Sequence, residues 1–339
     1  MGQMKKIMKS HEMSSFLFLA ALIFLVGCVN PSFWQPTSIL NCFNDSVVFT
    51  LLAVGSAFVI LTGEIDVSVG ATLGMSAAVG ATLLRDGSNW MIAILTAVAI
   101  GAAIGFVNGY GVSVLQIPSL IFTLGVNGVV RGLIYVFTKG AWVENLPAGY
   151  TKISNTFIAG QLTVFYAVTL LVVVAGHMML THTKKGKYFI AVGDNAAGAT
   201  MVGIPASQTK IMSYVLSGIF AAAAGMIYTS RIGFITPTAG SGYEMKAIAA
   251  CVLGGISLTG GQGSLVGAAI GAIIMSSISR ILVFLGFSSD YDNTITGILL
   301  ITIVVINTVT QNKAILRARH QTLTARTAAD SGKKGGVQS

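Results

Sequence analysis

Residues 90–112 read WMIAILTAVAIGAAIGFVNGYGV, a run without a charged side chain. A helix of about 20 apolar residues crosses the roughly 30 Å hydrocarbon core of a bilayer, so this run predicts a membrane-spanning helix. The rest of the chain is similar: of its 339 residues, 54% are hydrophobic and only 9% are charged. Soluble domains carry about 25% charged residues. The composition therefore excludes an ordinary soluble protein and predicts an all-α, polytopic membrane protein.

The same criterion predicts about ten spans in one domain. They fall near residues 14–29, 47–62, 69–84, 90–112, 117–138, 162–180, 210–229, 246–258, 264–286 and 294–310. The second and eighth are short, so each is either a full crossing or a broken or re-entrant element. The first also resembles a lipoprotein signal ending at Cys28, but the membrane sequence that follows favours an uncleaved helix.

Loop charge predicts the orientation. Lysine and arginine are concentrated in segment 1–13, in the loop 181–210 and in the tail 311–339. Because cytoplasmic loops carry the excess of positive charge, we expect all three segments in the cytoplasm and the transmembrane domain at 14–310. The net charge of +9 is explained by this bias, and no face suited to nucleic acid is present.

The energy source is expected to lie outside the chain. All 11 acidic residues fall at predicted span ends or in loops, whereas ion-coupled carriers keep a carboxylate at membrane depth. No G-x-x-x-x-G-K-[ST] phosphate loop occurs, so any ATPase is a separate subunit. The four histidines and three cysteines lack metal-ligand spacing, and no serine lies in a G-x-S-x-G context. We predict no metal, no cofactor and no enzyme.

Several polar residues are candidates for a translocation path. Arg131 lies inside a predicted span, where a charged side chain indicates function by default, although it also lies near enough to a span end to reach the interface. The same alternatives hold for Arg280. Asn127 either lines a path or bonds between helices. Asp66 and Ser68 either contact solute or cap the next helix.

Two glycine-interrupted segments resemble each other. Residues 63–70 read GEIDVSVG and residues 254–261 read GGISLTGG, and each follows a short apolar run. Such paired interruptions indicate the translocation path of a transporter. In a glycine-rich membrane sequence, a chance match is the alternative.

The loop 181–210 contains a predicted short helix. Asp194 and Asn195 offer capping side chains, Ala196 and Ala197 give the helix a small face, and Gly203 ends it. This helix either docks in the groove of a partner or forms a simple surface loop.

Four motifs together resemble the ribose and related-sugar permeases of bacterial ABC importers, which are akin to branched-chain amino acid permeases. They are residues 63–70, the stretch from Ile117-Pro118 to Thr123-Leu124-Gly125, the stretch Gly193–Ala197 with Gly203-Ile204, and residues 244–258. One departure is Glu64, where the family usually has glycine.

The resemblance implies a multi-pass permease of the bacterial inner membrane that works by alternating access. It implies a second permease, identical or paralogous, two ATP-binding cassette subunits docked on Asp194–Ala197 and Gly203-Ile204, and a periplasmic solute-binding protein. Residues 140–147 and 244–258 look most like permeases for autoinducer-2, followed by those for rhamnose and ribose. Phe122 offers a face to a sugar ring, or belongs to an interfacial aromatic belt. The alternative function is a stand-alone facilitator or channel without an ATPase.

Overall fold

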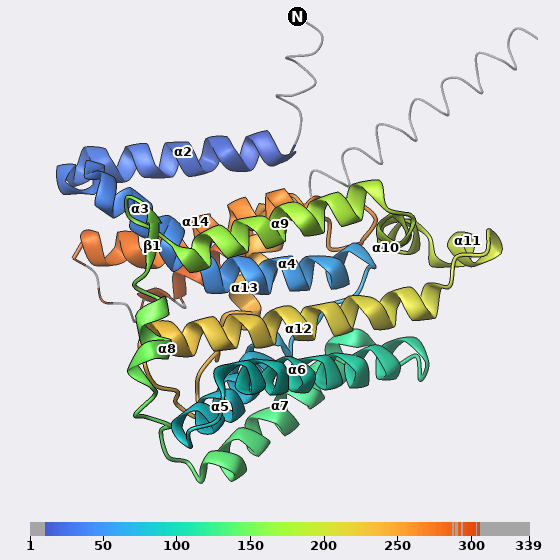
Figure 1. Ribbon diagram of the computed structural model, residues 1–339. Helices are drawn as coiled ribbons and strands as arrows, with labels where there is room; N and C mark the ends of the chain where they lie inside the picture. The colour runs from blue at the N-terminus through green and yellow to red at the C-terminus, as the bar shows by residue number, and fades with distance from the viewer. Residues whose placement is uncertain (1–10, 287, 289–290, 293, 303, 306–339) are drawn as a thin grey trace, which may run out of the picture. The chain divides into compact units, whose positions relative to one another are not determined.

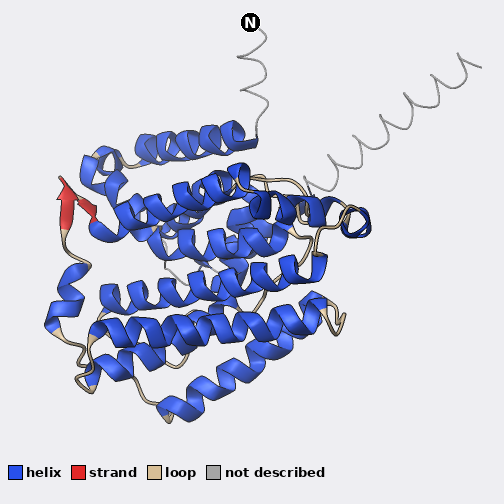
Figure 2. Cartoon of the chain, turned by 45° about the vertical axis from the view of Figure 1, so that its right-hand side comes forward, coloured by secondary structure: helices blue, strands red, loops and turns tan. Residues whose placement is uncertain are grey.

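The computed structural model describes residues 11–286, 288, 291–292, 294–302 and 304–305, and divides into two compact units after Thr296. The first unit is built of helices and one small hairpin (Figures 1 and 2). Its elements are α2 (His11–Val29), η1 (Pro31–Trp34), α3 (Pro36–Asp45), α4 (Val47–Leu61), α5 (Val69–Arg85), α6 (Trp90–Ser113), α7 (Ser119–Thr138), α8 (Ala148–Ile153), β1 (Phe157–Ala159), β2 (Leu162–Thr163), α9 (Val164–His182), α10 (Lys184–Asp194), α11 (Ala196–Met201), α12 (Ala206–Ile232), α13 (Tyr243–Leu253) and α14 (Leu265–Phe284). Of the second unit, residues 297–302 and 304–305 are described, and they are helical. The predicted tail 311–339 lies outside the described residues, as does most of segment 1–13.

The membrane-protein prediction is confirmed. Five described helices (α6, α7, α9, α12 and α14) are long and apolar enough to cross a bilayer, and α3 with α4 forms a sixth candidate, bent by 42°. Shorter apolar helices occur at Ser15–Val29 and in α5. The count of ten spans therefore stays a prediction.

The structure extends one predicted boundary and decides between the alternatives for the eighth element. The segment before residue 47 is helical rather than a loop, because α3 continues into α4 through the bend. The predicted span 246–258 corresponds to α13, which has 11 residues and is about 16 Å long at 1.5 Å per residue. Such a helix is too short to cross a bilayer alone, so the eighth element is a partial one.

Helix α12 lies at the centre of the first unit and packs against α4, α5 and α6. Its contact with α6 is close because glycines face each other: a Cβ at Gly101 would overlap the Gly218 carbonyl, and one at Gly105 would overlap that of Tyr214. Small residues allow this approach between membrane helices. Helix α4 is buried along nearly its whole length.

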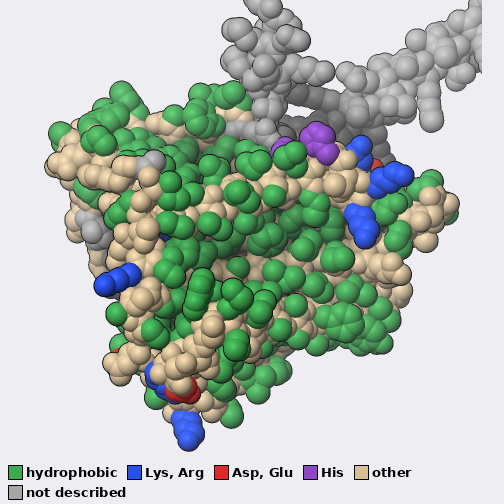
Figure 3. All heavy atoms as spheres, in the orientation of Figure 1, with side chains coloured by type: hydrophobic (Ala, Val, Ile, Leu, Met, Phe, Trp, Pro, Cys, Tyr) green, Lys and Arg blue, Asp and Glu red, His purple; other side chains and the backbone are tan. Residues whose placement is uncertain are grey.

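The helices bring two sets of short elements to opposite ends of the unit (Figure 1). Helix α8 and the β1–β2 hairpin lie at one, which we call the hairpin end. Helices α10 and α11 lie at the other, which we call the α11 end. The face in Figure 3 is mainly hydrophobic, with lysine and arginine near its two ends. This distribution suits a bilayer around the middle of the unit.

Candidate coupling and translocation sites

The predicted helix in the loop 181–210 is present as α11. Asn195 caps it, since its side chain accepts a hydrogen bond from the Gly198 N–H at 2.9 Å. Gly203 has a φ of +82°, a conformation that glycine adopts readily, and the Ile204 N–H donates to the Ala199 carbonyl at 3.0 Å. Asp194 is the last residue of α10 and is exposed. The capping prediction is therefore confirmed for Asn195 but not for Asp194, and the termination at Gly203 is confirmed.

The small face of α11 borders a cavity, and its role as a docking face stays a prediction. Ala196 and Ala197 line a cavity of about 450 Å³ in the chain itself, together with Glu64 and Lys210. The side chains that project outward are those of Met201 and Val202, which are 87% and 76% exposed. Met201 and Val202 are not among the predicted site residues, although an apolar pair beside the Gly203 turn is a detectable signal in the sequence.

Three backbone segments meet at the α11 end without side chains between them. They are residues 62–68 (the first break), residues 254–264 (the second break) and the end of α10. The Gly261 N–H donates to the Leu61 carbonyl at 3.0 Å. A Cβ at Gly193 would overlap the same carbonyl, and a Cβ at Gly260 would lie 2.7 Å from the Gly63 nitrogen. We call Gly63, Gly193, Gly260 and Gly261 the glycine junction.

The glycine junction joins the two segments that resemble each other in sequence. Gly63 belongs to the motif at residues 63–70 and Gly260 to the one at residues 254–261. The motifs therefore lie against each other, each beside a short element, with α10 resting on both. Their contact makes a chance match less plausible than it was on sequence alone.

Asp66 lies between α4 and α5, as expected for a residue between two spans, and it is buried. It is 3% exposed, and Ser217, whose hydroxyl donates to it at 3.0 Å, lies about 16 Å along α12 from Ala206. The carboxylate also accepts bonds from the Ser68 N–H and hydroxyl at 2.9 and 2.7 Å. The Asn108 amide in turn donates to the Ser68 hydroxyl at 2.7 Å. A carboxylate therefore does lie deep in the unit, and the exclusion of ion-coupled transport by lack of one does not hold.

This carboxylate is nevertheless fully engaged in protein contacts. Its hydrogen bonds fix the first break against α12, and the Val67 N–H donates to the Thr123 hydroxyl of α7 at 3.1 Å. Ser68 precedes α5, but its side chain makes no capping hydrogen bond. Asp66 and Ser68 thus hold the first break in place, and neither a simple cap nor an open contact surface describes them.

Arg131 lies beside an acidic residue that the path prediction had not included. Its Nη1 donates to the Ala239 carbonyl at 2.5 Å, while a Cβ at Gly70 would lie 3.3 Å from its Nη2 and overlap Glu244 Oε2. Arg131 Nη2 and Glu244 Oε2 are buried and have no hydrogen-bond partner among the described residues. Two side chains of opposite charge therefore flank Gly70, and each has a buried polar atom without a hydrogen bond.

Asn127 and Phe122 have different surroundings. The Oδ1 of Asn127, one helical turn before Arg131, is also buried and without a hydrogen-bond partner within the described part of the chain. The Phe122 ring fills the space beside Gly111 of α6 and packs with Val59, Val112 and Tyr214. Asn127 is thus placed with Arg131, whereas Phe122 is engaged in packing in this conformation.

Arg280 does not extend freely to the interface. Its Nε and Nη2 donate to Asp45 Oδ2 at 2.8 and 2.6 Å, and Arg231 Nη2 donates to Asp45 Oδ1 at 2.6 Å. One carboxylate at the end of α3 therefore joins α12 and α14. We call Asp45, Arg231 and Arg280 the Asp45 cluster.

Comparisons with known proteins identify the family of this chain. Residues 38–304 match the family described as branched-chain amino acid transport system / permease component. The chain is 39% identical to the autoinducer 2 import system permease protein LsrC of Enterobacter sp. (strain 638), over 90% of this chain and 88% of the relative. It is 37% identical to the protein of the same name from Klebsiella pneumoniae, over 99% and 96%. The Salmonella typhimurium protein is 36% identical over 90% and 87%. No solved structure matches the chain.

The family match covers most of the chain and confirms the resemblance inferred from the four motifs. It also confirms that the chain is a transport component rather than an enzyme. The chain belongs to the family of branched-chain amino acid transport system permease components.

Proposed function

We propose that this permease imports autoinducer 2, or another sugar-like solute such as rhamnose or ribose, as part of an ATP-driven importer. The observation that carries the proposal is the 36–39% identity, over about nine-tenths of the chain, to permeases named for autoinducer 2 import.

The proposed partners follow from the position of α11. An ATP-binding cassette subunit docks on this helix, with the side chains of Met201 and Val202 entering an apolar groove of that subunit. Large exposed apolar side chains on a short polar loop indicate such a contact. We place both termini and the α11 end in the cytoplasm, because α10 carries Lys184, Lys185 and Lys187. A second permease, identical or paralogous, and a periplasmic solute-binding protein complete the importer.

The glycine junction offers a route from α11 to the membrane interior. When ATP closes the cassette subunits, α11 moves and α10 moves with it. Because α10 touches both breaks through backbone atoms, its displacement reaches α4, α5, α13 and α14 together. Asp66 and Ser68 hold the first break during this movement.

We place the solute path beside Arg131 and Asn127, with Glu244 added to the predicted set. Their buried and unpaired polar atoms suit hydroxyl groups, which both donate and accept hydrogen bonds. Phe122 contributes by holding α7 against α6.

The test is co-purification of the chain with its ATP-binding subunit, followed by assay of ATP hydrolysis and uptake. We expect Met201→Asp to abolish co-purification, because a charge would be buried in an apolar contact. Gly203→Asp is expected to uncouple transport while the chain still inserts, since the φ of +82° suits aspartate poorly.

The matched control is Thr200→Asp, which places the same charge on an exposed position of α11 and should co-purify normally. Normal uptake by both Met201→Asp and Gly203→Asp would contradict the docking role. Downhill uptake into vesicles that lack ATPase would favour the stand-alone facilitator instead.

A further inference from the structure

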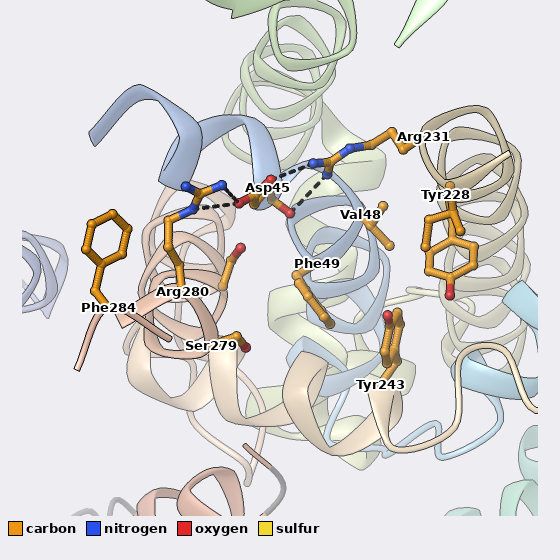
Figure 4. A pocket seen from close by; sticks show the side chains of 11 residues that line it. Asp45, Val48, Phe49, Tyr228, Arg231, Tyr243, Ser279, Arg280 and Phe284 are labelled. Atoms are coloured by element: carbon orange, nitrogen blue, oxygen red, sulfur yellow. Dashed lines mark hydrogen bonds and ion pairs between the residues drawn. The ribbon is translucent and has the colours of Figure 1, made fainter. Parts of the chain in front are cut away.

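A cavity of about 570 Å³ lies at the hairpin end of the first unit, between the α3–α4 bend, α12, α13 and α14. Its walls include Asp45, Phe49, Tyr228, Arg231, Tyr243 and Arg280 (Figure 4). Its place at the hairpin end follows from Asn44, whose amide donates to the Gln161 carbonyl between the two strands at 2.8 Å. Small-molecule sites typically occupy about 300–1,000 Å³, so the cavity has a suitable size.

The Asp45 cluster gives this cavity an excess of positive charge and of hydrogen-bond donors. In Figure 4 the Asp45 carboxylate lies between the two guanidinium groups. Both of its oxygens are engaged, Oδ1 by Arg231 and Oδ2 by Arg280. Arg231 also donates from Nη1 to the Asp45 carbonyl at 3.3 Å. Arg231 Nε and Arg280 Nη1 are the guanidinium nitrogens that make no hydrogen bond to a residue that the structure describes. A guanidinium group donates hydrogen bonds and accepts none, so these free N–H groups suit a ligand with oxygen acceptors.

Aromatic rings supply the apolar part of the wall. The Phe49 and Tyr243 ring centroids lie 4.8 Å apart, and those of Tyr228 and Tyr243 lie 6.1 Å apart. Behind Phe49, the Lys246 ammonium pairs with Asp292, and this pair adds no net charge. Ser279 donates to the same Asp292 at 2.9 Å. The cavity therefore combines flat apolar faces with convergent polar groups.

We propose that this cavity binds a small ring molecule rich in hydroxyl oxygens, as an entry site for the transported solute. The inference rests on the proposed import function and names where the solute first binds. An apolar ring face packs on the aromatic wall, while hydroxyl oxygens accept from the arginines. An amino acid fits less well, because its ammonium group needs an acceptor carboxylate and both oxygens of Asp45 are engaged.

The cavity and the proposed path have neighbouring residues in the sequence. Tyr243 lines the cavity, and the next residue, Glu244, lies beside Gly70 and Arg131. The cavity and the proposed path thus both include residues at the start of α13. The entry site and the path share one helix end.

The experiment measures thiol labelling at the cavity in cells that contain the complete importer. Ser279→Cys is placed in a Cys28→Ala chain, because Cys28 is exposed whereas Cys42 and Cys251 are buried. A membrane-impermeant thiol reagent is added outside, with and without autoinducer 2, and with leucine as the amino-acid comparison. We expect labelling that autoinducer 2 slows and leucine does not.

Thr156→Cys is the control, because Thr156 is exposed at the same end and does not line the cavity. It should be labelled at a rate that neither compound changes. Adding Arg280→Gln to the Ser279→Cys chain keeps the pair between Arg231 and Asp45. It should raise the autoinducer 2 concentration for half protection about tenfold, the effect of one charge-assisted hydrogen bond.

Two results would overturn the entry site: no labelling of Ser279→Cys from outside, or labelling that autoinducer 2 does not slow. Protection by leucine alone would overturn the solute class. Uptake by the same cells tests the proposed function separately. If solute accumulates with ATP but does not protect Ser279→Cys, only the entry-site proposal is overturned. If it protects Ser279→Cys but does not accumulate, the import function is overturned and the binding site stands.

Discussion

The two ends of the first unit are held together in different ways. At the α11 end, backbone meets backbone in the glycine junction, and no side chain lies between the two breaks and α10. At the hairpin end, three charged side chains of the Asp45 cluster bridge α3, α12 and α14 beside a cavity. The glycine junction has backbone in direct contact with backbone, whereas the Asp45 cluster joins its helices through ion pairs at the edge of a cavity.

This difference indicates a division of labour. Backbone contacts are short and unyielding, so a displacement at one segment moves its neighbours. Ion pairs between long side chains can exchange partners while the helices separate. The α11 end is thus suited to transmit movement and the hairpin end to open and admit solute.

The largest expected effect comes from Gly193→Ala, because the new methyl group would overlap the Leu61 carbonyl in a contact with no flexible side chain to yield. Overpacking of this kind costs about 1–3 kcal/mol, and here it also separates α10 from the first break. ATP-driven uptake should be nearly abolished, while ATP hydrolysis by the docked subunits continues.

Gly149→Ala in α8 serves as the control, since nothing lies within 4 Å of a Cβ there. Uptake and membrane yield are measured for both variants. If Gly193→Ala transports as well as Gly149→Ala, the glycine junction does not transmit movement.

The next effect is that of Asp45→Asn, which leaves two guanidinium groups sharing a neutral amide. Allowing for the partial exposure of the three side chains (27–33%), we expect a loss of about 1–3 kcal/mol in the free energy of unfolding. Arg280→Gln should cost less, because Arg231 keeps its partner. Thermal unfolding in detergent gives the order, and equal losses would show that Asp45 does not bridge both arginines.

A smaller effect on the free energy of unfolding is expected for the ion pair at the α11 end, in which Lys210 Nζ lies 2.5 Å from Glu64 Oε1. A double-mutant cycle of Glu64→Gln and Lys210→Met should give a coupling free energy of about 1 kcal/mol. A coupling energy this small is expected because backbone contacts, rather than ion pairs, mainly hold the α11 end together. A coupling energy above that of Asp45 with Arg280 would reverse the assignment of roles.

The smallest effect is expected for the exposed pair Arg85–Asp86, whose side chains are 41% and 57% exposed. Arg85→Gln should change the free energy of unfolding by less than about 0.5 kcal/mol. A loss as large as that of Arg280→Gln would mean that charge alone, without bridging, stabilises the hairpin end.

Local sequence signals were sufficient for much of the fold. Apolar runs gave the long helices, and the Asn195 cap and the Gly203 turn gave the limits of α11. The similarity of residues 63–70 and 254–261 pointed to two segments that lie in contact. These features depend on neighbours in the sequence or on repeated patterns.

The remaining features depend on contacts between distant residues. Asp45 pairs with arginines 186 and 235 positions away, so it looked like an ordinary span-end acid. Asp66 looked like a helix cap because its partner Ser217 is 151 positions away. Exposure of Met201 and Val202 depends on how α11 lies against the chain. For the pairings of Asp45 and Asp66, no pattern within a single segment carries this information.

The central claim is that movement enters through α11 from a docked ATP-driven neighbour. The most direct measurement is solute accumulation in proteoliposomes that contain the purified chain alone, or the chain with its ATP-binding subunits, second permease and solute-binding protein. We predict accumulation against a gradient only with the complete set and ATP, and its loss in Met201→Asp. Accumulation by the chain alone, or by the complete set without ATP, would contradict the account.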